Sequence, residues 1–260
     1  MQAQRGIPLV GLGMLGFAAC DETTGPTGDD FDWSARIAPG DAIEIKGVDS
    51  DIIATAAAGN VVTVTAAMEG ETDDPADVHI DVITHGGGVT ICAAYPDVPG
   101  QLPNECAAGD DGYLTTQDND MTITFWVSVP PGFDLIGKTA NGTVRGADLE
   151  GDAFAATVNG DVTVYTTQLA TAMTVNGNLT VAIGIRHWVH GLLFPTVNGN
   201  ATVEIPSTSS AEVRLSTANG TISSDFPLTQ VAPGDGRGTL GGQFLRLTTV
   251  NGNVTLERGP

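Results

Sequence analysis

A short unit, Thr-[Val/Ala]-Asn-Gly, recurs through the second half of the chain and constrains its fold more than any other feature. Its asparagines are Asn141, Asn159, Asn176, Asn198, Asn219 and Asn251. The intervals between them are 18, 17, 22, 21 and 32 residues. Intervals of about 20 residues are typical of proteins in which each repeat forms one rung of a stack. The spacing therefore favours a β-solenoid with insertions in its later rungs.

An Asn-Gly pair between alternating apolar residues is also a strong hairpin signal. In a two-residue hairpin, the residues on either side of the pair face each other across the strands. Val158 would then pair with Asp161, and Val175 with Asn178, which places an apolar residue against a polar one each time. The sequence thus argues against a hairpin at every unit, although an antiparallel β-meander or sandwich remains the alternative fold.

Uninterrupted alternation through each unit gives a more consistent pattern. It predicts that Phe154, Ala156, Val158 and Gly160 share the inward face with Val162, and that the asparagine points outward. Glycine at an inward position permits a bend or a close approach of backbones. The same pattern slips before Ala218 and Val250, where we expect a bulge or a turn.

Stacked rungs would bring the six repeat asparagines into one outward column with a spacing of about 4.8 Å. Repeated amides in such a column can form a hydrogen-bonded ladder. The asparagines then have two interpretations, as turn and ladder structure or as a contact surface. The candidate binding face consists of Asn141, Asn159, Asn176, Asn198, Asn219 and Asn251.

Strand-like alternation extends well before the repeats. It begins near Asp32 and predicts strands within residues 42–48, 61–68, 78–84, 89–95 and 121–132. No window has a convincing helical period, so we expect an all-β chain. An N-terminal β region, residues 32–136, should continue into the Asn-Gly repeat region, residues 137–260.

The N-terminus has the pattern of an export signal. Arg5 precedes an apolar segment that is long enough for export and too short to span a bilayer. Small residues just before Cys20 predict a signal peptide over residues 1–19 and lipidation of Cys20, with ordinary secretory cleavage as the alternative. Residues 20–31 then form an acidic tether.

Two of the three cysteines remain once Cys20 carries a lipid. An exported compartment permits a disulfide, so we expect Cys92 and Cys106 to be bonded to each other. The alternatives are a metal-binding pair or two free thiols, and no further cysteine completes a metal site.

Charge is unevenly distributed along the chain, whose net charge is −21. Residues 1–136 contain 22 acidic and 3 basic side chains, whereas residues 137–260 contain 9 acidic and 7 basic ones. Such a field repels nucleic-acid phosphates, so no nucleic acid is expected as a partner. The acidic half serves solubility or collects cations.

Residues with catalytic or metal-binding chemistry are sparse. The sequence lacks nucleophile, zincin and phosphate-loop motifs. His187 and His190 are too few for a zinc site and are more typical of a surface insertion with Trp188 packed on the fold.

Four acids, Asp110, Asp111, Asp118 and Asp120, have oxygen ligands suited to Ca²⁺, but their spacing matches no calcium loop and favours a solvated acidic loop. Lys46 and Lys138 are the only lysines, and no stretch of sequence groups the arginines. We therefore expect no catalytic residue, no metal and no cofactor.

Several further segments accompany the repeats: "IEIKGVDSDI", "GGGVTICAAYP", "PNECA", "VPPGFDLIGKTANGTV", "VEIP" and "GGQFLRLTTVNGNVTLERG". In this order they resemble the putative-adhesin β-strand-repeat family of bacterial envelope proteins, also called toastrack domains, over residues 32–258. The resemblance implies an extracytoplasmic all-β repeat domain, brings no catalytic residues, and includes relatives that accompany envelope stress-response systems. The chain departs from the family at "VDSD" near residue 50 and in a glycine-rich insertion before Gln243.

The sequence therefore predicts an exported, membrane-anchored lipoprotein of the bacterial cell envelope, in the periplasm or at the cell surface. Its role would be structural or adhesin-like binding, and its partners would be the membrane, through the lipid, and a glycan or another envelope protein. The alternatives are an accessory sensor domain in envelope stress signalling and, with less support, a polysaccharide-active enzyme.

Overall fold

The computed structural model describes residues 31–260. The predicted signal peptide, Cys20 and the tether before Phe31 lie outside the described residues. Within them, regular structure is almost entirely β-strand, with a single short 3-10 turn, η1 (Pro75–Asp77). The all-β prediction is confirmed. No helix of residues 31–260 is long and apolar enough to cross a membrane.

The five strands predicted in the first half are present within a few residues of their expected positions. The strands of the first half are β1 (Phe31–Ala35), β2 (Ala42–Lys46), β3 (Ser50–Ala56), β4 (Val62–Glu69), β5 (His79–His85), β6 (Gly88–Ala94) and β7 (Thr122–Val129). The second half contains β8 (Asp134–Lys138), β9 (Val144–Leu149), β10 (Ala153–Ala156), β11 (Val162–Thr166), β12 (Ala170–Met173), β13 (Leu179–Ile183), β14 (Leu192–Pro195), β15 (Ala201–Pro206), β16 (Ala211–Asn219), β17 (Ile222–Ser224), β18 (Thr229–Ala232), β19 (Asp235–Thr239), β20 (Gln243–Asn251) and β21 (Val254–Gly259).

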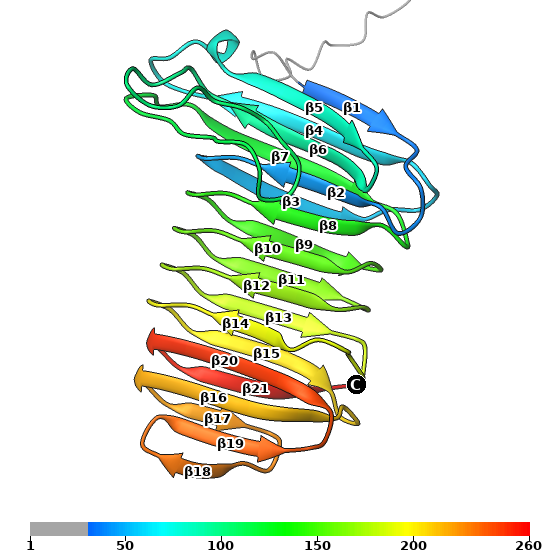
Figure 1. Ribbon diagram of the computed structural model, residues 1–260, viewed down its shortest axis with the longest axis vertical. Coiled ribbons are helices and arrows are strands. Elements are labelled where there is room, and N and C mark those ends of the chain that lie inside the picture. The colour runs from blue at the N-terminus through cyan, green and yellow to red at the C-terminus, as the bar shows by residue number, and fades with distance from the viewer. Residues whose placement is uncertain (1–30) are drawn as a thin grey trace, which may run out of the picture.

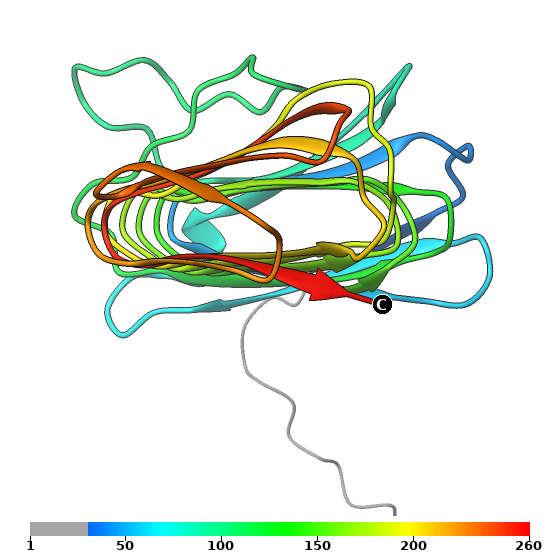
Figure 2. The ribbon, with the colours of Figure 1, turned by 90° about the horizontal axis from the view of Figure 1, so that it is seen from below.

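The strands form two faces of a flattened coil, seen along its length in Figure 2. One face is a ten-stranded sheet in the order β1-β4-β7-β3-β9-β11-β13-β15-β21-β17. The opposite face consists of a six-stranded sheet, β12-β10-β8-β2-β6-β5, and a five-stranded sheet, β14-β20-β16-β19-β18. From β8 to β15 the chain alternates between the faces, so that each turn of the coil adds one strand to each (Figure 1).

Pairing between successive turns is parallel and in register. Val162, Leu179 and Ala201 are neighbours across β11, β13 and β15, for example. Each Asn-Gly unit therefore pairs with the units of adjacent rungs and not across itself. The hairpin interpretation does not hold for the repeats.

Both ends of the coil are closed by antiparallel strands. At one end β4 pairs antiparallel with β7 and with β1, and at the other β19 pairs antiparallel with β16 and with β18. The glycine-rich insertion before Gln243 forms the β18–β19 hairpin. Antiparallel pairs at the ends limit the length of parallel edge on which another chain could stack.

The last strands leave the sequential order of the rungs. β20 inserts between β14 and β16, and β21 inserts between β15 and β17. The unit at Asn251 consequently lies between those at Asn198 and Asn219. Figure 1 shows both strands, in red, above the orange ones that precede them in sequence.

The core lies between the two faces, and one hydrophobic cluster extends from the N-terminal β region into the repeats. The predicted unbroken alternation through each unit is wrong. Ala153, Ala155 and Thr157 point inward before the corner, and Val162 points inward after it. Val158, expected inside, is 45% exposed.

The reason is that residues 158–161 form the corner between the two faces. The chain changes direction there, so each strand begins a new alternation of its own. The shift in alternation that the sequence suggested at Ala218 and Val250 arises from this corner, which every unit has. Thr217 and Thr249 are buried just as Thr157 is, and Val250 is exposed like Val158.

Candidate functional site

Each Asn-Gly corner is held from inside by its threonine. The hydroxyls of Thr157, Thr174 and Thr196 each donate to the glycine carbonyl of the preceding rung's corner at 2.9 Å. Thr217 and Thr249 make the same bond at 2.8 Å to the glycine carbonyl of the rung stacked next to them. Because buried carbonyls need a donor, threonine satisfies a group that valine would leave unpaired.

The predicted outward amide column is present as a continuous ladder. In spatial order it runs through Asp49, Asn141, Asn159, Asn176, Asn198, Asn251 and Asn219. Each asparagine Nδ2 donates to the side-chain oxygen of the preceding member at 2.6–2.8 Å. All the amides are exposed and all point their donors the same way. An amide has two N–H donors and two acceptor sites, so each member keeps hydrogen-bonding capacity toward solvent.

Asp49 is the member of the ladder that the repeat pattern did not identify. It occupies the position of a repeat asparagine in "VDSD", the segment that departs from the repeat. Its carboxylate accepts from Asn141 Nδ2 at 2.6 Å. A carboxylate suits this end because the first member of the ladder has no preceding member to donate a hydrogen bond to. The hydrogen bond that it accepts is charge-assisted.

Two further columns run beside the ladder. The residue before each asparagine forms an apolar column, made of Ala140, Val158, Val175, Val197, Val250 and Ala218. The second residue after each asparagine forms a polar column, in which Asp161, Asn178, Asn200 and Asn253 accept hydrogen bonds from backbone N–H groups of the next rung. We call these three columns together the asparagine edge.

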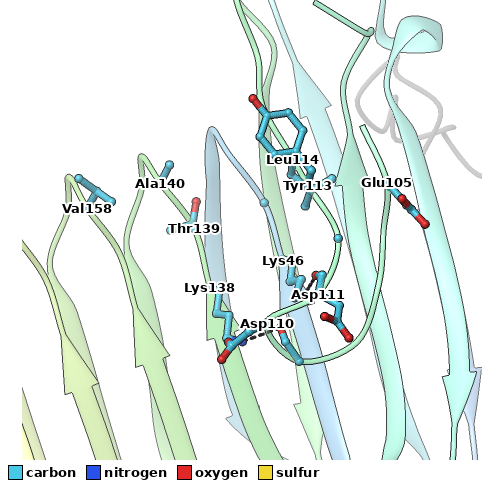
Figure 3. A pocket seen from close by; sticks show the side chains of 13 residues that line it. Lys46, Glu105, Asp110, Asp111, Tyr113, Leu114, Lys138, Thr139, Ala140 and Val158 are labelled. Carbon is cyan, nitrogen blue, oxygen red and sulfur yellow. Dashed lines mark hydrogen bonds and ion pairs between the residues drawn. The ribbon is translucent and has the colours of Figure 1, made fainter. Parts of the chain in front are cut away.

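A loop held by the predicted disulfide overhangs one end of this edge. Cys92 and Cys106 are bonded, with their Cα atoms 5.7 Å apart, which confirms the prediction. The bond ties the loop that follows β6 back onto that strand. Residues 105–114 of the loop then cross the outer face of β2 and β8 (Figure 3).

A buried charged cluster holds this loop in place. Glu44 is only 3% exposed, and its Oε2 accepts from Thr90 Oγ1 and from the backbone N–H of Gly109, both at 2.8 Å. Lys46 Nζ donates to the carbonyls of Ala107 and Asp111, at 2.6 and 3.0 Å. Lys138 Nζ lies 3.1 Å from Glu44 Oε1.

The pKa values of the two lysines are shifted in opposite directions. Burial lowers the pKa of Lys46, and the nearby charge of Glu44 only partly offsets this. Burial would also lower the pKa of Lys138, but its hydrogen bonds to Asp110 and Glu44 outweigh that effect and raise the pKa. Both ammonium groups are engaged in holding the loop.

A pocket of about 340 Å³ lies between the loop and the first corners of the asparagine edge. Tyr113 and Leu114 line it on the loop side, and Ala140 and Val158 line it on the side of the edge. Figure 3 shows these corners beside the loop, with Lys46 and Lys138 beneath it.

The four candidate Ca²⁺ ligands do not converge. Asp110 pairs with Lys138 at 3.0 Å, whereas Asp120 accepts from Thr72 and from the backbone of residues 71–73. In the part of the chain that the structure describes, no group of three or more His, Cys, Asp or Glu side chains could hold a metal ion. Trp188 is buried against the core, as predicted, in the insertion that carries His187 and His190.

Tyr95 should make the fold sensitive to alkali. Its hydroxyl is buried and donates toward the carbonyls of Asp49 and Met121, at 3.0 and 3.1 Å. Burial raises its pKa well above the ordinary value of 10. Above pH 10 the unfolded chain releases this proton and the folded chain keeps it, so stability falls as pH rises.

We expect urea unfolding between pH 10 and 11 to show this loss, and Tyr95→Phe to make the fall of the unfolding free energy with pH less steep. An unchanged slope in the variant would assign the alkaline loss to other groups.

Comparison with solved structures finds five similar chains, two of which are described below. No protein-family model matches the chain, and no curated protein matches it. A structure described as a putative cell adhesion protein from Clostridium sporogenes ATCC 15579 is 8% identical, with 88% of this chain and 100% of that chain covered and a TM-score of 0.38. A putative adhesin from Bacteroides fragilis NCTC 9343 is 12% identical, with 89% and 98% covered and the same TM-score of 0.38. The fold described above rests on the strand pairing of this chain itself.

Proposed function

We propose that this chain is a lipid-anchored protein of the bacterial cell envelope, without catalytic activity, whose β-solenoid presents the asparagine edge to a neutral glycan. The export signal and Cys20 support the anchor and the location. The observation that carries the binding role is the edge itself, in which exposed valines lie beside a hydrogen-bonded row of amides.

The chemistry of the edge suits uncharged sugars. Sugar rings have apolar faces that can pack on the valine column, and hydroxyl groups that can exchange hydrogen bonds with the free amide donors and acceptors. The ladder holds these amides in fixed orientations, so binding loses little side-chain entropy. Repetition along the edge favours an extended polymer over a small molecule.

Binding can be tested on the full chain with Cys20→Ser, which keeps the protein free of lipid. The probe is an array of neutral glycans, and the variant is Val175→Glu, which changes the apolar column but leaves every ladder amide in place. Tyr165→Glu is the matched control, because Tyr165 and Val175 are both 39% exposed and Tyr165 lies on β11, away from the edge.

We expect Val175→Glu to weaken binding at least tenfold and Tyr165→Glu to leave it unchanged. Equal loss in both variants, or no binding by the folded parent, would contradict the binding role. The anchor is tested separately by cell fractionation. The unmodified chain should be found in the membrane fraction, and the Cys20→Ser variant should not.

A further inference from the structure

Three arginines far apart in the sequence form one row on the five-stranded sheet. Arg246 on β20 is the direct neighbour of Arg214 on β16, and Arg214 is the direct neighbour of Arg237 on β19. Residues in register on adjacent strands project from the same face. The sheet therefore groups arginines that the sequence leaves scattered. All three are exposed, on the outer face of β16, β19 and β20. These strands lie at the lower end of Figure 1.

This arginine row is only partly neutralised. Asp235 Oδ2 lies 3.2 Å from Arg237 Nη2 and 3.6 Å from Arg214 Nη2, so one carboxylate serves two guanidinium groups. Within residues 31–260, no carboxylate lies within ion-pair distance of Arg246. The side chains of Arg214 and Arg237 remain 46% and 52% exposed.

Repulsion among the three guanidinium groups destabilises the folded state unless negative charge offsets it. Like charges directly opposite each other on neighbouring strands are destabilising. A chain with a net charge of −21 has few arginines, yet three of them stand side by side here. A bound anion would relieve the repulsion and complete the charge balance.

The surroundings of the row indicate the shape of that anion. Glu212 lies on one side of the row, two residues before Arg214, and Asp235 lies on the other. Positive charge is thus confined to a narrow line across the strands, with a spacing of about 4.8 Å between neighbouring strands. Exposed apolar side chains adjoin Arg246, namely Phe244 and Leu193.

We propose that the arginine row binds an acidic polysaccharide, whose carboxylate or sulfate groups lie along the three guanidiniums. Guanidinium forks bind planar and tetrahedral oxyanions through paired hydrogen bonds. Phe244 and Leu193 offer an apolar surface to a sugar ring at the end of the row. A plane of anionic lipid headgroups fits less well, because it would also meet Glu212, Asp235 and the acidic remainder of the molecule.

The test uses the full chain with Cys20→Ser and four probes: polygalacturonate, dextran sulfate, uncharged dextran, and vesicles that contain phosphatidylglycerol. The variant is Arg214→Gln with Arg246→Gln. The matched control is Arg36→Gln with Arg145→Gln, which removes the same charge from exposed positions elsewhere. Thermal unfolding of each protein verifies its fold.

We expect the parent to bind at least one acidic polymer and not dextran, and the row variant to bind it at least tenfold more weakly with a shallower dependence on salt. The control should bind like the parent, and Glu212→Gln should bind more tightly. Equal weakening in the control would reduce the effect to net charge and overturn the proposal. So would binding to the vesicles alone, or no binding to either polymer.

Discussion

Gly199→Ala is expected to destabilise the fold by about 3 kcal/mol, through backbone strain and overlap together. A Cβ at this position would overlap the carbonyl oxygen of Gly177 in the neighbouring rung. The backbone at Gly199 also has φ +155°, a conformation that residues with a side chain rarely adopt. Neither rung can move aside, since Gly177 N–H donates to Asn198 O and Gly199 N–H donates to Asn251 O, both at 2.9 Å.

Gly241→Ala separates the two contributions. Gly241 has φ +80°, so alanine is strained there as well, but nothing lies within 4 Å of its Cβ position. Urea unfolding should give a cost of about 1 kcal/mol for this control, from backbone strain alone. The excess in Gly199→Ala then measures how tightly the rungs stack at the corner. Equal costs in the two variants would mean that the backbone at the corner shifts to accommodate the methyl group, so that the rungs are not tightly stacked there.

The strands and the disulfide could be predicted because their signals are local. Alternation with a period of two marks β2, β4, β5, β6 and β7 within a few residues of each. If Cys20 carries a lipid, as predicted, the other two cysteines leave one natural pair. The asparagine ladder was also predictable, since a constant unit aligns with its copies when the strands stack in parallel, and insertions between units do not disturb that alignment.

The direction of side chains around each corner was not predictable in the same way. Alternation describes a straight strand, but the chain turns from one face to the other at residues 158–161. Thr157 follows the inward alternation of β10, and Val162 begins a new one in β11. The bond from Thr157 to the carbonyl of Gly142 fixes this arrangement, and it depends on a neighbouring rung that the local sequence does not contain.

The position of the last rung depends on tertiary contacts as well. β20 lies between β14 and β16, and β21 lies between β15 and β17. No local signal in the sequence distinguishes this insertion from a simple continuation of the stack. The same limit applies to charged groups. Lys46 and Lys138 are neighbours only because β2 and β8 pair in register, and the arginine row exists only because β16 lies between β20 and β19.

Glu44→Gln is expected to cost about 3 kcal/mol, the lower end of what removal of one partner from a buried ion pair costs. Glutamine keeps the shape of the side chain and can still accept from Thr90 and Gly109, but it removes the carboxylate 3.1 Å from Lys138 and 4.0 Å from Lys46. Lys46 would then remain charged and buried with only backbone carbonyls as direct partners.

The pH dependence distinguishes this effect from a packing defect. Since burial already lowers the pKa of Lys46, the unfolded chain holds that proton more tightly than the folded one, and stability rises with pH through this range. Loss of the Glu44 charge lowers the pKa further, so Glu44→Gln should regain stability between pH 8 and 10 more steeply than the parent does in urea unfolding. Asp110→Asn, which removes the exposed partner of Lys138, is the control and should leave stability unchanged. If both variants had the same small effect, Glu44 would not be what holds the loop over β2 and β8, and the disulfide alone would carry that role.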